Sequence, residues 1–62
     1  MDERLLTGNE VAQKLNISRS FAFLLMQQGT IPTVRLGRLV RVRPADLDKF
    51  IEQSIDENTE TR

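Results

Sequence analysis

The spacing of apolar residues changes twice along this 62-residue chain, and this change constrains the fold more than any other feature. Residues 5–28 repeat apolar side chains at helical intervals, residues 33–43 alternate apolar and polar side chains, and residues 44–55 return to helical intervals. Alternation is typical of strands, so the middle segment does not continue the helices beside it. A chain this short forms one domain with one small core. The pattern predicts a mainly α fold with a small β-hairpin.

The first helix is marked by signals at its start. Thr7 and Glu10 stand three residues apart, the spacing at which each side chain caps the backbone N–H group of the other residue. Leu6, just before this capping box, is placed to pack against Val11. We expect a helix from this cap to about Leu15.

A short turn at residues 16–17 leads to the second expected helix. Ser18 is a good N-cap for a helix over residues 19–28, which Gly29 and then Pro32 end. Two short helices joined by a tight turn form the helix-turn-helix pattern, in which the second helix is angled to enter the DNA major groove.

The second helix is apolar on nearly all sides. Its period of 3.6 residues places one group on the arc expected to be buried: Phe21, Ala22, Leu25 and Met26. The opposite arc holds Ser20 and Gln27, whose side chains can hydrogen-bond to base edges or phosphates. Phe23 and Leu24 flank that arc. Contact with thymine methyl groups, insertion at the DNA groove, contact with a second protomer and packing over the hairpin all remain open, and further packing within the domain is the simplest alternative.

Residues 33–43 predict two antiparallel strands around a turn at Gly37. We expect a three-residue loop, residues 37–39, because this register separates the apolar side chains from the arginines on opposite faces. The apolar face would hold Val34, Leu36, Val40 and Val42, and the other face Arg35, Arg41 and Arg43. Arg35 then stands opposite Arg41, a mildly repulsive pair that an anionic ligand would stabilise.

The third expected helix begins at Pro44, a residue suited to a first helical turn, with Asp46 near its positive end. Its expected buried stripe comprises Leu47, Phe50, Ile51 and Ile55. The domain is therefore expected over residues 5–55, between a flexible N-terminus at residues 1–4 and a polar tail at residues 56–62.

Charge is divided along the chain although the formal net charge is zero. Residues 11–45 contain six basic residues and no acidic residue, whereas acidic residues predominate in residues 46–62. Clustered Lys and Arg attract a polyanion such as a phosphate backbone, because binding releases condensed counterions. A solvated basic face without a partner is the simpler alternative, and the arginines of the hairpin favour phosphate binding over it.

Composition argues against several other classes of protein. The chain has no His, Cys or Tyr, so the usual proton shuttle, thiol nucleophile, soft metal ligands and phenolic nucleophile are missing. We expect no enzymatic activity, no metal and no cofactor. No apolar run approaches the length of a membrane span and the start of the chain is unlike a signal peptide, so we expect a cytoplasmic protein, nucleoid-associated when bound to DNA.

Five short segments follow one another in a specific order. They are Leu-Leu-Thr at residues 5–7, Glu-Val-Ala at 10–12, Ile-Ser-Arg-Ser at 17–20, Gly-Thr-Ile-Pro at 29–32 and Val-Arg-Leu-Gly-Arg at 34–38. Together they resemble the excisionase-like, or AlpA-like, helix-turn-helix proteins, small relatives of the MerR DNA-binding domain. The resemblance implies a winged helix-turn-helix domain that binds double-stranded DNA, as an excisionase (recombination directionality factor) of a mobile element or as a transcriptional regulator.

This resemblance and the hairpin pattern together predict DNA contacts on the second helix and on the hairpin: Ser18, Arg19, Ser20, Phe23, Leu24, Gln27, Gln28, Arg35, Arg38, Arg41 and Arg43. The second helix departs from the family pattern because Arg19 is its only charged residue, so phosphate contacts are expected mainly on the hairpin. Implied partners are DNA, an integrase or recombinase, and a second copy of the chain on DNA through Phe23 and Leu24. A protein-interaction adaptor is the alternative from another class.

Overall fold

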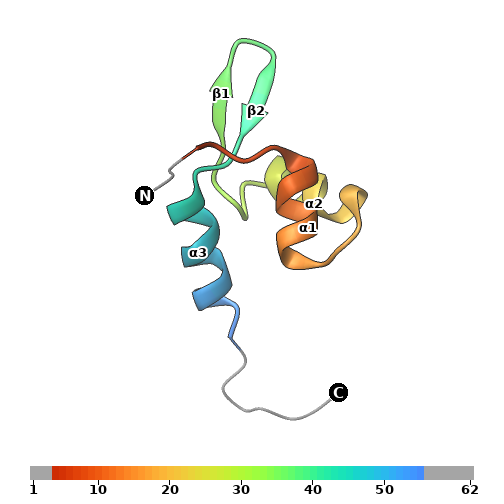
Figure 1. Ribbon diagram of the computed structural model, residues 1–62, viewed down its shortest axis with the longest axis vertical. Helices are drawn as coiled ribbons and strands as arrows, with labels where there is room; N and C mark the ends of the chain where they lie inside the picture. The colour runs from red at the N-terminus through yellow and green to blue at the C-terminus, as the bar shows by residue number, and fades with distance from the viewer. Residues whose placement is uncertain (1–3, 56–62) are drawn as a thin grey trace.

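The computed structural model describes residues 4–55. The elements follow the order α1 (Gly8–Leu15), α2 (Arg19–Gln27), β1 (Val34–Leu36), β2 (Leu39–Arg41) and α3 (Pro44–Gln53). In Figure 1, α1 and α2 lie side by side, the hairpin extends beyond them at one end of the molecule, and α3 extends toward the other end. This arrangement confirms the predicted winged helix-turn-helix class.

The ends of the two helices in the helix-turn-helix are fixed by the predicted caps. Thr7 Oγ1 accepts a hydrogen bond from the Glu10 N–H group (3.1 Å), and Glu10 Oε1 accepts one from the Thr7 N–H group (2.8 Å). Asn16 ends α1 in the left-handed conformation, with φ of 58°. Ser18 Oγ accepts a hydrogen bond from the Phe21 N–H group (3.1 Å) and so caps α2. These caps satisfy backbone groups that the helices leave unpaired and hold the tight turn between them.

The core lies where the helix pair, the α2–β1 connection, the end of the hairpin and α3 meet. Its buried members are Val11, Ala12, Ala22, Met26, Ile31, Val42 and Leu47. Ile31 is fully buried, and its N–H group donates to the Leu25 carbonyl (3.2 Å), so the connection is packed against the end of α2. The core therefore joins α2 and the hairpin into one unit.

A short backbone bridge fixes the base of the hairpin. Leu6 and Val42 pair in antiparallel fashion, with the Leu6 N–H group donating to the Val42 carbonyl (2.8 Å) and the Val42 N–H group donating to the Leu6 carbonyl (2.9 Å). Leu6 directly precedes the capping box of α1. The bridge consequently ties the start of the helix-turn-helix to the edge of the hairpin, an attachment that the sequence pattern did not predict.

The predicted register of the hairpin is wrong. Val34 pairs with Arg41, Arg35 with Val40, and Leu36 with Leu39, which leaves a two-residue loop at residues 37–38. Gly37 has φ of 63° and Arg38 does not have a positive φ, the pattern of a type II′ turn, which suits a two-residue hairpin and prefers glycine at its first position. Arg35 and Arg41 therefore point to opposite faces and do not repel each other across the strands.

Two predicted buried stripes are also narrower than expected. Phe21 is 49% exposed although its neighbour Ala22, in the same first turn of α2, is fully buried, so the buried arc of α2 is centred on Ala22 and Met26. On α3, Leu47 is buried and Phe50 half-buried, whereas Ile51 is exposed; Ile55 lies beyond the end of the helix and is exposed too. The first turns of α3 reach the core and its later residues extend past it (Figure 1). The predicted tail at residues 56–62 lies outside the described residues, as do residues 1–3.

Candidate nucleic-acid interface

An open groove of about 500 Å³ separates α2 from the hairpin. Residues of α2, of the connection and of both strands line it: Phe23, Met26, Gln27, Gly29, Thr33, Arg35 and Val40. Its walls are apolar near Phe23 and Val40, and its polar groups come from Gln27, Thr33 and Arg35. A deoxyribose-phosphate strand has the same mixture of apolar sugar and anionic phosphate.

The exposed arc of α2 holds most of the predicted contacts on that helix. Ser20 and Gln27 are exposed near the centre of the arc, as predicted. Phe23 lies on the side that borders the groove, and Leu24, 45% exposed, lies about 100° further round the helix. The predicted contacts on α2 are thus divided between the groove side and the far side.

Phe23 is held against the start of α1. A Cβ atom placed on Gly8 would lie 2.5 Å from Phe23 Cζ and 2.6 Å from Cε1, so only glycine leaves room for the ring at that position. The outer part of Phe23 is 48% exposed and forms one wall of the groove. Phe23 is therefore a fixed apolar surface beside Gln27. The sequence pattern gave no signal for the role of Gly8, because a glycine after Thr7 also suits an ordinary helix start.

The remaining α2 contacts lie at its two ends. Ser18 uses its hydroxyl oxygen as the N-cap, and Arg19 is exposed directly after it. Gln28 is exposed at the other end, where it forms the C-cap and its N–H group donates to the Leu24 carbonyl (2.9 Å). Ser18 and Gln28 lie on either side of the nine residues of α2, about 15 Å apart along a helix, so one DNA contact surface would have to extend along all of α2.

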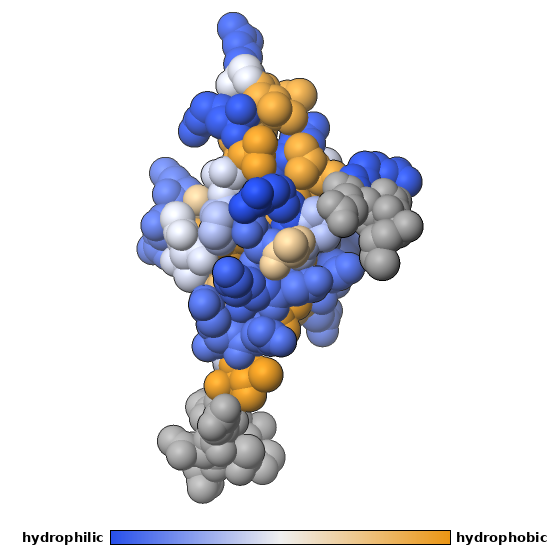
Figure 2. Space-filling model, turned by 90° about the vertical axis from the view of Figure 1, so that its left-hand side faces the viewer, coloured by the Kyte–Doolittle hydropathy of each residue, from blue (hydrophilic) through white to orange (hydrophobic). Residues whose placement is uncertain are grey.

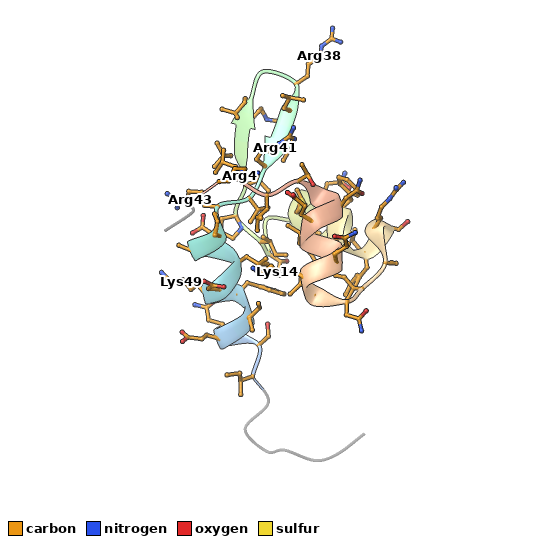
Figure 3. All side chains as sticks on the ribbon, viewed as in Figure 1. Arg4, Lys14, Arg38, Arg41, Arg43 and Lys49 are labelled. Atoms are coloured by element: carbon orange, nitrogen blue, oxygen red, sulfur yellow. The ribbon has the colours of Figure 1, made fainter. Side chains whose placement is uncertain are left out.

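The hairpin arginines surround the hairpin instead of sharing one face. Arg35 points to the groove side together with Val40, Arg41 lies on the opposite face, and Arg38 occupies the tip (Figure 3). Arg41 is half-buried and its Nη1 donates to the Val40 carbonyl (3.0 Å), which holds the side chain along β2. Within residues 4–55, no carboxylate forms a salt bridge with these three side chains. Their charge is available to an anion approaching from the tip or from either side.

Arg43 differs from the other predicted arginine contacts. It follows β2 as the N-cap residue of α3, and its guanidinium binds Asp46 in bidentate fashion, with Nε–Oδ2 and Nη2–Oδ1 distances of 2.7 and 3.1 Å. The hydrogen bond from Arg43, together with its charge, lowers the pKa of Asp46, and the same contact raises the pKa of Arg43. Arg43 is thus placed at the start of α3, with its charge balanced by Asp46 (Figure 3).

A second hollow, of about 340 Å³, lies near the start of the chain. Arg4, Lys14 and Pro44 line it together with Glu10. The carboxylate of Glu10 makes this surface less suited to a phosphate than the groove beside α2. In residues 4–55, no group of three or more His, Cys, Asp or Glu side chains is arranged to hold a metal ion. No helix in that part of the chain has the length and apolar character needed to cross a membrane.

The groove also contains residues that the sequence analysis did not select. Thr33 and Val40 line it from the hairpin side, and Met26 lines it from α2 although it is 6% exposed. Val40 lines the groove beside Arg35 because the register with a two-residue turn brings these two side chains to the same face.

Comparison with known proteins agrees with this geometry. A family model described as a helix-turn-helix domain matches residues 5–54, the segment that contains all five elements of the fold. Searches among curated proteins and among solved structures found no match. The match covers far more than half of the chain, and it supports DNA as the binding partner. The chain belongs to the helix-turn-helix domain family of small, excisionase-like or AlpA-like DNA-binding proteins.

Proposed function

We propose that α2 enters the major groove of double-stranded DNA while the hairpin contacts the flanking backbone or minor groove. The observation that carries this proposal is the groove between the two elements, which Arg35 lines from the hairpin side and Phe23 and Gln27 line from α2. One DNA strand lying in this groove would meet a cation, an amide and two apolar surfaces. Ser20 and Gln27 would read base edges, and the hairpin arginines would bind phosphates.

Within this mode of binding, we propose the role of an excisionase. The protein positions DNA for a recombinase or integrase and carries out no covalent step, since the chain has no Tyr, Cys or His to act as nucleophile or proton shuttle. Several copies would occupy neighbouring sites, in contact through Leu24, which lies outside the groove lined by Phe23. Such a protein would be cytoplasmic and associated with the nucleoid while bound.

Two alternatives use the same surface. A transcriptional regulator needs the same α2 and hairpin contacts, so it differs in its target site and not in its structure. A protein-interaction adaptor would use the apolar side chains of α2, of which Phe21 and Leu24 are the most accessible on the side away from the groove.

Mobility-shift and footprinting experiments on DNA flanking the gene of this protein separate these roles. An excisionase should give stepwise multiple shifts and should change the recombination products of a co-encoded integrase. A single shift at one palindrome, without an effect on recombination, would support a transcriptional regulator. Affinity that does not decrease between low and moderate salt would contradict DNA binding by the basic surface and would favour the adaptor.

A further inference from the structure

The end of the hairpin carries an apolar pair that the DNA contacts described above do not use. Leu36 and Leu39 are direct cross-strand partners on either side of the loop, and they are 49% and 53% exposed. They lie on the face opposite Arg35 and Val40, and so point away from the groove beside α2. Figure 2 shows apolar surface on the hairpin, directly below its hydrophilic tip.

The charges around Leu36 and Leu39 are positive, so they favour an anionic partner for this apolar pair. Arg38 projects from the loop between the two leucines, and Arg41 lies on the same face, further from the tip. Residues 11–45 contain no acidic residue, so an approaching anion meets no repulsion from neighbouring side chains on the hairpin. An apolar pair with cations at its edge matches the DNA minor groove, whose rims carry phosphates and whose walls are sugar rings.

Exposed isoleucines on α3 and just after it provide a contrast. Ile51 and Ile55 are also accessible, but Asp48 and Glu52 are exposed beside Ile51 on the same side of the helix. Their carboxylates would repel a phosphate backbone. The hairpin leucines therefore differ from the exposed isoleucines in their neighbours and not in their exposure: arginines, and not carboxylates, lie beside them.

We propose that Leu36 and Leu39 form an apolar wedge that enters the minor groove and bends the DNA, with Arg38 on the adjacent phosphates. This inference rests on the proposed DNA binding. Leucines inserted at a base step partly unstack it and bend the duplex by about 20–90° toward the major groove.

The test measures bending separately from binding. A mixed-sequence duplex with a donor dye at one end and an acceptor at the other reports the bend by energy transfer, and permanganate reactivity of thymines reports unstacking. The test variant is Leu36→Thr with Leu39→Thr, because threonine suits a strand but is too short and polar to act as a wedge. The matched control is Ile51→Gln with Ile55→Gln, which removes two exposed isoleucines, one on α3 and one just after it.

At saturating protein, the wild type and the α3 control should increase energy transfer and thymine reactivity, and the hairpin variant should lose both increases. It should keep most of its affinity, because its arginines remain. Bending by the hairpin variant equal to that of the wild type would overturn the wedge, as would binding by the wild type without any bend. Sedimentation showing a DNA-free dimer that only the hairpin variant loses would assign the leucines to a second copy instead. Failure of the wild type to bind any duplex would refute the proposed function itself.

Discussion

Helix α2 and the hairpin border the same groove, yet they differ in almost every property that matters for binding DNA. Arg19 is the only charged residue of α2, whose exposed arc is otherwise uncharged, whereas the hairpin has Arg35, Arg38 and Arg41 on two strands and a loop. The position of α2 is fixed by caps and a buried face, and that of the hairpin by a tight turn and the bridge from Leu6. This contrast teaches that attraction to phosphate and discrimination between bases can be assigned to separate elements.

The proposed assignment of phosphate binding to the hairpin and of base reading to α2 requires that the two elements keep a fixed relative position. We expect this position to depend on Ile31. This side chain is fully buried in the connection between them. Replacing it with Ala should lower the free energy of unfolding by about 2–5 kcal/mol, because the cavity removes contacts with both elements. Thermal denaturation would measure the loss, with Leu39→Ala on the exposed hairpin surface as the control. An equally large loss in the control would mean that the hairpin, and not the connection, determines stability.

The groove wall at Phe23 can be disturbed without touching α2 directly. Gly8→Ala would place a methyl group within 2.6 Å of two ring atoms of Phe23. We expect a loss of about 1–3 kcal/mol in stability from this overpacking, although alanine is the better helix former. Phe23→Leu in the same chain removes the clashing atoms and should recover most of the loss. Chemical denaturation of the two single variants and the double variant checks this; additive losses would show that the contact with Gly8 does not position the ring.

Base discrimination is expected to depend on α2. Gln27→Ala should reduce the preference for the target sequence over random duplex by about 1–3 kcal/mol and leave the salt dependence of binding unchanged. Competition anisotropy with both duplexes measures the two quantities, and Gln53→Ala on α3 serves as the control. A uniform loss of affinity on all sequences would assign Gln27 to the phosphate backbone.

The smallest expected effect concerns Asp46. Its ion pair with Arg43 distinguishes that arginine from Arg35, Arg38 and Arg41. Its pKa is lowered by the contact with Arg43, so this contact stabilises the fold above the ordinary pKa of Asp46. The stabilisation should be lost as the pH falls through the lowered value. Asp46→Asn should therefore weaken the acid-side decrease in melting temperature. If the melting temperatures of the wild type and of Asp46→Asn decreased equally at acidic pH, the ion pair would add nothing to stability.

Much of the fold could be predicted because it is determined locally. The capping box at Thr7, the N-cap at Ser18 and the proline that begins α3 act within one turn of chain, and each was confirmed. The exposure of Phe21 and of Ile51 could not be predicted in this way, because helical periodicity identifies an apolar arc but not how much of it a neighbour covers.

The hairpin shows how two sequence signals can conflict. Separation of apolar residues from arginines favoured a three-residue loop, whereas Gly37 at the first loop position favoured a two-residue turn, and the turn determined the register. In a hairpin that projects from the rest of the domain, apolar and charged side chains can share a face, because neither face is fully covered. The groove could not be predicted from the three-residue register, because only the two-residue turn puts Arg35 and Val40 on one side of the hairpin.

The central claim, that the hairpin arginines supply the electrostatic part of DNA binding, is tested most directly by the salt dependence of affinity for random duplex DNA. Arg35→Ala and Arg38→Ala should each flatten the slope of log affinity against log salt concentration by about 1, because each removes one phosphate contact. Arg43→Ala, which removes the same charge from a residue already paired with Asp46, should leave the slope nearly unchanged. Equal slopes for all three variants would contradict the claim.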